Sequence, residues 1–303
     1  KTAQLSHKKL TKNDLKNITS NQILNRVRTL SRLNENKYLI NHLPQLIENL
    51  DKKTRKKLGE AYLEALFDEL FYSRIINLYK KGTLTKKWNI PNEVQLYWVA
   101  ISYIKRKNIS EGRSKIYKIE RKNSKDKRLP KLFDAIATRY MLDSEIEKAQ
   151  FWWKRLINNF PKNRLTPKST WRLAWTHLQK KNIDKSIFYL KKGLKSKIYN
   201  SEMKAKLLYW QGKLYQTTGK NELAKKSFKK LIQNQPNTYY GMRLLSSSET
   251  LKSVIELNKS RKANIYSEPK GQLSKKTKEL LRRTEFLFDI AESEQAVHEL
   301  FFG

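Results

Sequence analysis

The sequence predicts an all-α protein, a superhelical array of antiparallel helical hairpins of the α-solenoid type. Three observations lead to this fold class. Glycine and proline are scarce, at 9 and 7 of 303 residues, about half of average usage, which disfavours turn-rich β folds. Apolar residues recur at spacings of three and four, as one face of a helix requires. Between residues 92 and 245 a pattern of small and large residues also repeats every 37 or 38 positions, which is typical of stacked helix pairs.

The first domain, residues 1–91, is predicted to contain irregular helical hairpins. Apolar residues at helical spacing mark three segments, Ile23–Leu33, Tyr38–Leu50 and Leu58–Tyr79. Asn13-Asp14 and Pro44 are expected to separate helices, because such residues favour turns. This part of the chain does not follow the repeat.

The second domain, residues 92–245, carries four copies of the repeat. In each copy a small residue and an aromatic residue occupy the first helix, and a small and a large residue occupy the second. Small residues are needed where two helices cross closely, and large ones fill the groove beside them. This arrangement resembles a tetratricopeptide (TPR) helix pair. The repeat positions are Ala100, Tyr103, Ala137, Tyr140, Ala149, Ala174, Gly212, Tyr215, Ala224, Phe228 and the closing Pro236.

The first helix of each pair is predicted to line the inner surface of the array, because stacked hairpins coil into a superhelix with a concave side. Aromatic residues and lysines recur there. One interpretation is a groove that stacks sugar rings or bases and pairs with anionic groups. The other is that the aromatic rings pack against the next turn of the superhelix. The candidate groove residues are Tyr97, Trp171, Trp175, Tyr209, Lys168, Lys206 and Lys213.

The third domain, residues 246–303, is predicted as a connecting stretch followed by linker helices. Ser246-Ser247-Ser248 and Pro269-Lys270-Gly271 are typical of a connection. A helical pattern then runs from about Ser274 to Phe302.

The chain is strongly basic, with 65 Lys and Arg against 28 Asp and Glu and a net charge of +37. Such a charge attracts anionic polymers of any kind. The basic residues are spread along the whole length and form no zinc-finger, RNP or basic-zipper motif. The charge is therefore either a lysine-rich solvated surface or a general polyanion-binding surface, and nucleic acid is the least favoured partner.

A family resemblance appears where the fourth repeat ends. Pro236 is followed by Thr238-Tyr239-Tyr240-Gly241, and Tyr209-Trp210-Gln211-Gly212-Lys213 precedes it. Together with Arg283–Leu287 and Ala296–Leu300, these segments resemble the helical superhelix and linker of soluble lytic murein transglycosylases. The resemblance implies a periplasmic, non-catalytic scaffold that positions peptidoglycan strands or shapes the cavity around a catalytic domain.

No catalytic centre is predicted. In that family a glutamate of a Glu-Ser motif, followed by Gly-Leu-Met-Gln, cleaves the glycan, but Glu292-Ser293 has no such continuation. No metal site, cofactor or membrane span is predicted; the chain has no cysteine, and His298-Glu299 lacks the second histidine of a zinc-protease helix. The alternative functions are a TPR-like protein–protein adaptor and, less favoured, a nucleic-acid-binding helical repeat.

Overall fold

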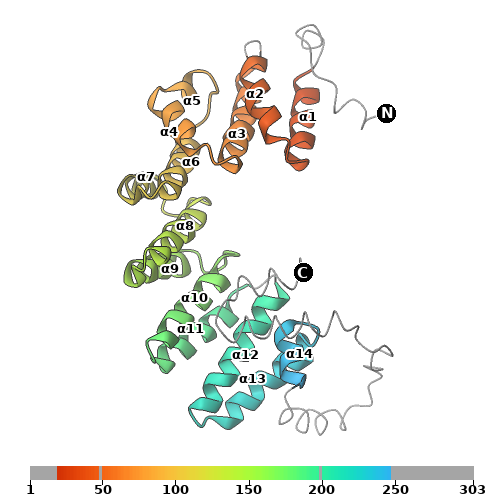
Figure 1. Ribbon diagram of the computed structural model, residues 1–303, viewed down its shortest axis with the longest axis vertical. Helices are drawn as coiled ribbons and strands as arrows, with labels where there is room; N and C mark the ends of the chain where they lie inside the picture. Colours follow the sequence, from red (N-terminus) through yellow and green to blue (C-terminus); the bar gives the residue numbers. More distant parts are fainter. Residues whose placement is uncertain (1–18, 48–49, 198–199, 247–303) are drawn as a thin grey trace, which may run out of the picture. The chain divides into compact units, whose positions relative to one another are not determined.

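The computed structural model describes residues 19–47, 50–197 and 200–246. These ranges contain fourteen α-helices and no strand (Figure 1). The predicted fold class, an all-α array of helical hairpins, is confirmed. Residues 247–303, which include the predicted linker helices and Glu292-Ser293, lie outside the described residues, as does Asn13-Asp14.

Four hairpins follow one another along residues 92–234, and each packs against the next (Figure 1). We call the first helix of each pair its A-helix and the second its B-helix. The A-helices are α6 (Asn92–Lys105), α8 (Leu129–Leu142), α10 (Thr166–Gln179) and α12 (Ser201–Thr217). The B-helices are α7 (Ile109–Lys122), α9 (Ile146–Asn159), α11 (Ile183–Lys195) and α13 (Asn221–Asn234).

The turn inside every hairpin has the same backbone hydrogen bonds. In each turn the second residue after the A-helix adopts a positive φ. The N–H of the residue that follows donates to the carbonyl of the aromatic repeat position, as in a Schellman motif. The positive-φ residues are Lys107, Ser144, Lys181 and Gly219, with φ of 64°, 60°, 57° and 71°. The returning bonds are Asn108 N to Tyr103 O, Glu145 N to Tyr140 O, Asn182 N to His177 O and Lys220 N to Tyr215 O, all of 2.8–2.9 Å.

The repeat positions form the contact between the two helices of each hairpin. Ala100, Ala137 and Ala149 are fully buried, so the helix backbones approach closely there. At Gly212 a Cβ would lie 2.3 Å from the ring of Phe228, because the B-helix phenylalanine occupies the space that a side chain would need. The small residues therefore set the spacing of the helices in each pair.

Charged and polar side chains join one hairpin to the next. Arg172 of α10 donates to Asp134 (2.6 Å) and Thr138 (2.9 Å) of α8. Its guanidinium also lies 5.4 Å from the ring centroid of Trp153. Such contacts add specific links to the apolar stacking between hairpins.

Five helices precede the hairpins, and their core continues into α6, which contributes Val99 and Tyr103. The five helices are α1 (Ser20–Arg32), α2 (Asn36–Leu46), α3 (Lys52–Asp68), α4 (Tyr72–Lys80) and α5 (Thr83–Lys86). The segment predicted as Leu58–Tyr79 is divided into two helices, because Leu70 has φ 61° and Phe71 N bonds to Leu66 O at 2.8 Å. The expected break at Pro44 is wrong, since this proline lies inside α2, close to its end.

The Tyr-Tyr-Gly segment begins α14 (Tyr239–Ser246). The Thr238 hydroxyl accepts from Gly241 N at 3.1 Å, which satisfies a free donor of the first turn. A Cβ on Gly241 would lie 2.2 Å from the carbonyl oxygen of Gln235. Glycine at this position therefore lets α14 start directly against the turn that closes the fourth hairpin.

His177 occupies the aromatic repeat position of the third hairpin. It is buried, and its ring stacks on Tyr189 with centroids 5.4 Å apart and planes within 5°. Burial lowers the pKa of His177 below its ordinary value of 6.5, and the charges of Lys154, Lys185 and Lys180 lower it further. Both causes favour the neutral imidazole over the charged form in the folded chain.

We expect this histidine to make stability depend on pH. Below pH 6.5 the unfolded chain gains a proton that the folded chain does not, so stability falls as the pH drops towards the lowered folded pKa. His177→Tyr restores the aromatic residue of the other hairpins and should lose less stability over this range. Melting temperatures of both proteins between pH 7.5 and 5 test this, and identical pH profiles would contradict it.

Candidate functional site

The predicted groove residues lie in two places on the A-helices. Tyr97 belongs to α6, whereas the other six belong to α10 and α12. The second place brings several of them together, because α10 and α12 are in contact.

Three tryptophans form a cluster across these two helices. Trp171 and Trp175 are four residues apart on α10 and so share one face, and Trp210 reaches them from α12. The ring centroids are separated by 5.6 Å (Trp171–Trp175), 5.9 Å (Trp171–Trp210) and 5.4 Å (Trp175–Trp210). All three side chains are half-buried, so each ring both packs within the cluster and faces solvent. We call Trp171, Trp175 and Trp210 the tryptophan cluster.

Lys206 lies beside this cluster with its ammonium group between two rings. The Nζ atom is 5.4 Å from the centroid of Trp171 and 5.9 Å from that of Tyr240. Burial lowers the pKa of Lys206, the charge of Glu202 opposes this shift, and Lys168 adds to it. No residue of the described ranges accepts a hydrogen bond from its ammonium. Cation–π contacts therefore position the Lys206 ammonium, and its N–H donors stay available to an incoming anion.

Tyr209 lies in the core and not on the groove surface. Its side chain is 7% exposed and packs on Tyr240 and Phe228 in the core, with centroids 5.1 and 6.4 Å away. Trp210 takes the surface position instead. A signal for this was present in the sequence, because Lys206, Trp210 and Lys213 follow one another at spacings of four and three and so share a helix face. Lys168 and Lys213 are exposed on the same two helices.

Tyr97 lines a separate cavity of about 890 Å³ between α1, α3, α6 and the turn before α8. Burial, with the nearby Glu64, raises the pKa of its hydroxyl. Arg128 at the rim is fixed by two bonds to Asp126, of 2.8 and 2.5 Å. These bonds hold the pKa of Asp126 below its ordinary value. The basic residues of the lining are Arg28, Arg32, Lys56, Lys57, Lys127, Arg128 and Lys131, against the acids Glu60 and Glu64.

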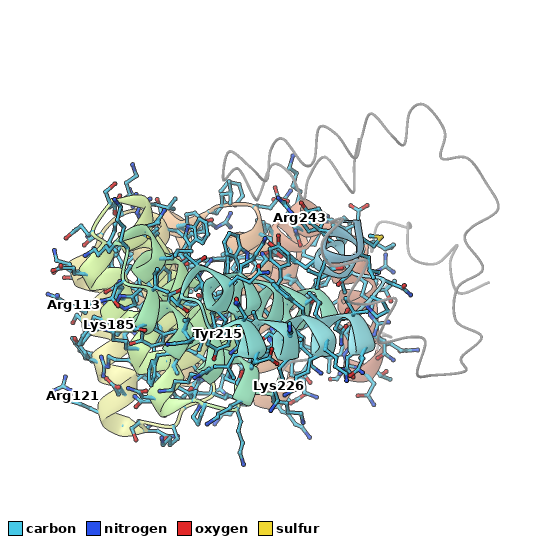
Figure 2. All side chains as sticks on the ribbon, turned by 90° about the horizontal axis from the view of Figure 1, so that it is seen from below. Arg113, Arg121, Lys185, Tyr215, Lys226 and Arg243 are labelled. Atoms are coloured by element: carbon cyan, nitrogen blue, oxygen red, sulfur yellow. The ribbon has the colours of Figure 1, made fainter. Side chains whose placement is uncertain are left out.

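Basic side chains also cover the B-helices. Figure 2 shows Arg113 and Arg121 of α7 pointing away from the ribbon, and both are exposed. Positive charge is therefore not confined to the neighbourhood of the tryptophan cluster.

The described residues contain no group of three or more His, Asp or Glu side chains placed to hold a metal ion. None of the helices described is long and apolar enough to cross a membrane. The tryptophan cluster offers flat apolar faces, and Lys206 beside it offers a cation. Together these groups suit an acidic or aromatic ligand segment.

A known repeat family matches the two hairpins that carry the tryptophan cluster. The tetratricopeptide repeat model matches residues 168–197 and 205–238, which correspond to α10 with α11 and α12 with α13. Among solved structures, the chain is similar to the crystal structure of BtubC (BKLC) from P. vanneervenii. That likeness has a TM-score of 0.43 at 11% identity and covers 83% of this chain and 98% of the other. No curated protein matches the sequence.

Proposed function

We propose that this protein is a helical-repeat adaptor that binds an acidic segment of a partner protein at the tryptophan cluster. The observation that carries the proposal is the cluster itself together with Lys206. Tryptophan is enriched among the residues that contribute most to binding at the centres of protein interfaces. Here three partly exposed tryptophans lie together. An ammonium with open donors beside them suits a carboxylate of the partner.

The repeat match supports the same site. Repeat arrays of this kind use extended surfaces to bind partners, and the two matched TPR units supply all three tryptophans. The net charge of +37 would speed the encounter with an acidic partner, and this contribution weakens as salt screens it.

A displayed peptide library selected on the whole chain tests the proposal. We expect the selected peptides to combine Asp or Glu with apolar residues. Trp175→Ala should weaken their binding at least about tenfold, since a central aromatic anchor is worth about 2 kcal/mol or more. Fluorescence polarisation with labelled peptides measures the affinities.

Phe151→Ala provides the matched control. Phe151 is an aromatic residue of the B-helix α9 and is 50% exposed, so its removal should leave the affinity unchanged. Circular dichroism would show that both variants fold. Equal affinities for the wild type and Trp175→Ala would exclude the tryptophan cluster as the binding site.

We propose a cell-wall role as the second candidate function. Support comes from the sequence resemblance to lytic transglycosylase superhelices and from the tryptophan faces, which could stack on sugar rings. A periplasmic location belongs to this proposal. Cosedimentation with purified sacculi tests it: binding that drops in Trp175→Ala but not in Phe151→Ala favours the glycan, and no binding at physiological salt rejects it.

A further inference from the structure

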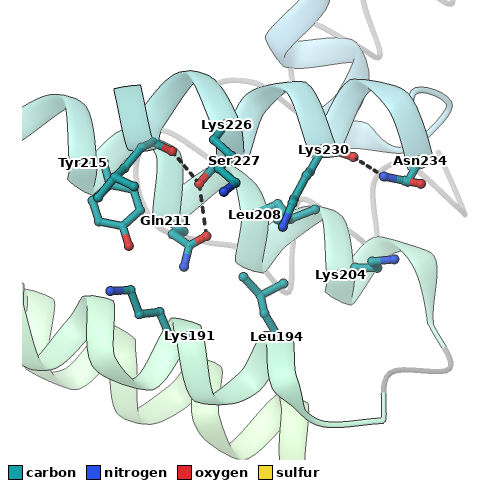
Figure 3. Close-up of a pocket in the computed structure, with 11 residues that line it drawn as sticks. Lys191, Leu194, Lys204, Leu208, Gln211, Tyr215, Lys226, Ser227, Lys230 and Asn234 are labelled. Carbon is teal, nitrogen blue, oxygen red and sulfur yellow. Dashed lines mark hydrogen bonds between the residues drawn. The ribbon is translucent and has the colours of Figure 1, made fainter. Parts of the chain in front are cut away.

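A second cavity lies between α11, α12 and α13, apart from the tryptophan cluster and the cavity at Tyr97. Its volume is about 510 Å³, which is within the usual range of small-molecule sites. Figure 3 shows side chains from all three helices around it. Its lining includes the apolar side chains of Leu194 and Leu208.

Four lysines surround this cavity, and no acidic residue lines it. They are Lys191 of α11, Lys204 of α12, and Lys226 and Lys230 of α13. None of the four makes an ion pair with any described residue. The neighbouring Lys225, in contrast, pairs with Glu222 at 3.0 Å. Like charges gathered without a counter-charge repel one another, and an anion between them removes this cost.

A buried amide at the cavity wall adds a hydrogen-bond donor. Gln211 is 8% exposed. Its Oε1 atom accepts from the Ser227 hydroxyl at 3.1 Å, and that hydroxyl oxygen lies 3.0 Å from Leu223 O. The amide nitrogen has no acceptor among the residues described, and Figure 3 shows it turned towards Lys191. This nitrogen is not among the sealed, unpartnered atoms of the core, so it is open to the cavity and can donate to a ligand or to water.

We propose that this cavity binds a compact polyanion that carries two or more linked phosphoryl groups. Lysine binds phosphate as a point charge, and four lysines balance the three to four negative charges of a di- or triphosphate. The Gln211 amide would donate to a phosphoryl oxygen, and Tyr215, whose ring lies 5.7 Å from the Lys191 ammonium, would border the ligand. This site is independent of the adaptor proposal because it shares none of its residues.

Isothermal titration calorimetry of the whole chain with sodium tripolyphosphate tests the site. We expect one-to-one binding, which Lys226→Gln with Lys230→Gln weakens about tenfold, because two charges facing the ligand are lost. Citrate and sulfate at the same ionic strength should bind much more weakly. Citrate binding as tight as tripolyphosphate binding would overturn the assignment to phosphate.

The matched control is Lys225→Gln with Lys229→Gln. These lysines lie on the same helix and the charge change is the same, but neither lines the cavity. The control should lose less than about threefold in affinity, because exposed charges away from the ligand contribute little and, of the lysines changed in the two double variants, only Lys226 and Lys230 line the cavity. If both double variants weaken binding equally, the anion binds through general charge and the proposed site does not exist.

Gln211→Glu gives a readout that needs no ligand. A carboxylate in place of the amide keeps the shape and introduces a counter-charge for the lysines. We therefore expect a higher melting temperature without anion and weaker tripolyphosphate binding. A lower melting temperature with unchanged affinity would contradict the proposal.

Discussion

Trp153→Ala should lower the free energy of unfolding by about 3–5 kcal/mol, the usual cost of removing a large aromatic side chain from a core. The indole of Trp153 is 1% exposed and occupies the large repeat position of the second hairpin. Its loss leaves a cavity and also removes the ring above which Arg172 lies. We expect the melting temperature to fall by roughly 6–20 °C, as measured by calorimetry.

The control for this prediction lies on the same helix. Phe151 of α9 is 50% exposed, so Phe151→Ala removes an aromatic ring without opening a cavity. Its effect should stay within about 0.5 kcal/mol, as for most surface substitutions. Similar losses at the two positions would show that Trp153 does not fill the core of this hairpin.

Ala149→Trp should destabilise the chain by about 1–3 kcal/mol or more, because a large ring cannot enter a closely packed helix crossing without moving the backbone. Ala149 is fully buried and belongs to the B-helix α9, which packs on both α8 and α10. Overfilling it should therefore disturb two hairpin contacts at once. Urea unfolding followed by circular dichroism measures the loss.

Glu147→Trp tests the same change on the exposed side of α9. The Glu147 side chain is 88% exposed and pairs with Lys180 only at 3.5 Å, a contact worth little. We expect almost no change in stability. If Ala149→Trp were equally harmless, the repeat would be displaced by one or more residues along the helices.

The repeat could be predicted from the sequence because its information is local. Ala100 and Tyr103, or Ala224 and Phe228, are three or four residues apart, and that spacing alone places them on one helix face. The division near Leu70 could not be foreseen in the same way. A leucine with a positive φ carries no turn signal, and only the packing of α3 and α4 explains it.

The sites were less predictable than the helices. Tyr209 and Trp210 are adjacent aromatic residues, so the choice of which one reaches the surface depends on how α12 rotates against its neighbours. The cavity between α11, α12 and α13 draws its residues from three helices with no common spacing. Lys191 and Gln211 line the same cavity because of tertiary packing, which no periodic pattern in the sequence records.

The identical turns inside the hairpins have a consequence for the history of such a chain. Each is fixed by main-chain bonds and accepts lysine, serine or glycine at its positive-φ position, so it demands little of the local sequence. The connection between hairpins is also similar in two cases, since Asp126 and Asn163 each accept from the N–H two residues later at 2.9–3.0 Å. A gene duplication that copies residues 129–165 would thus deliver a ready-made module with compatible ends, and later substitutions would only have to match its flanks. Lengthening or shortening by whole modules is an evolutionary route that this architecture leaves open.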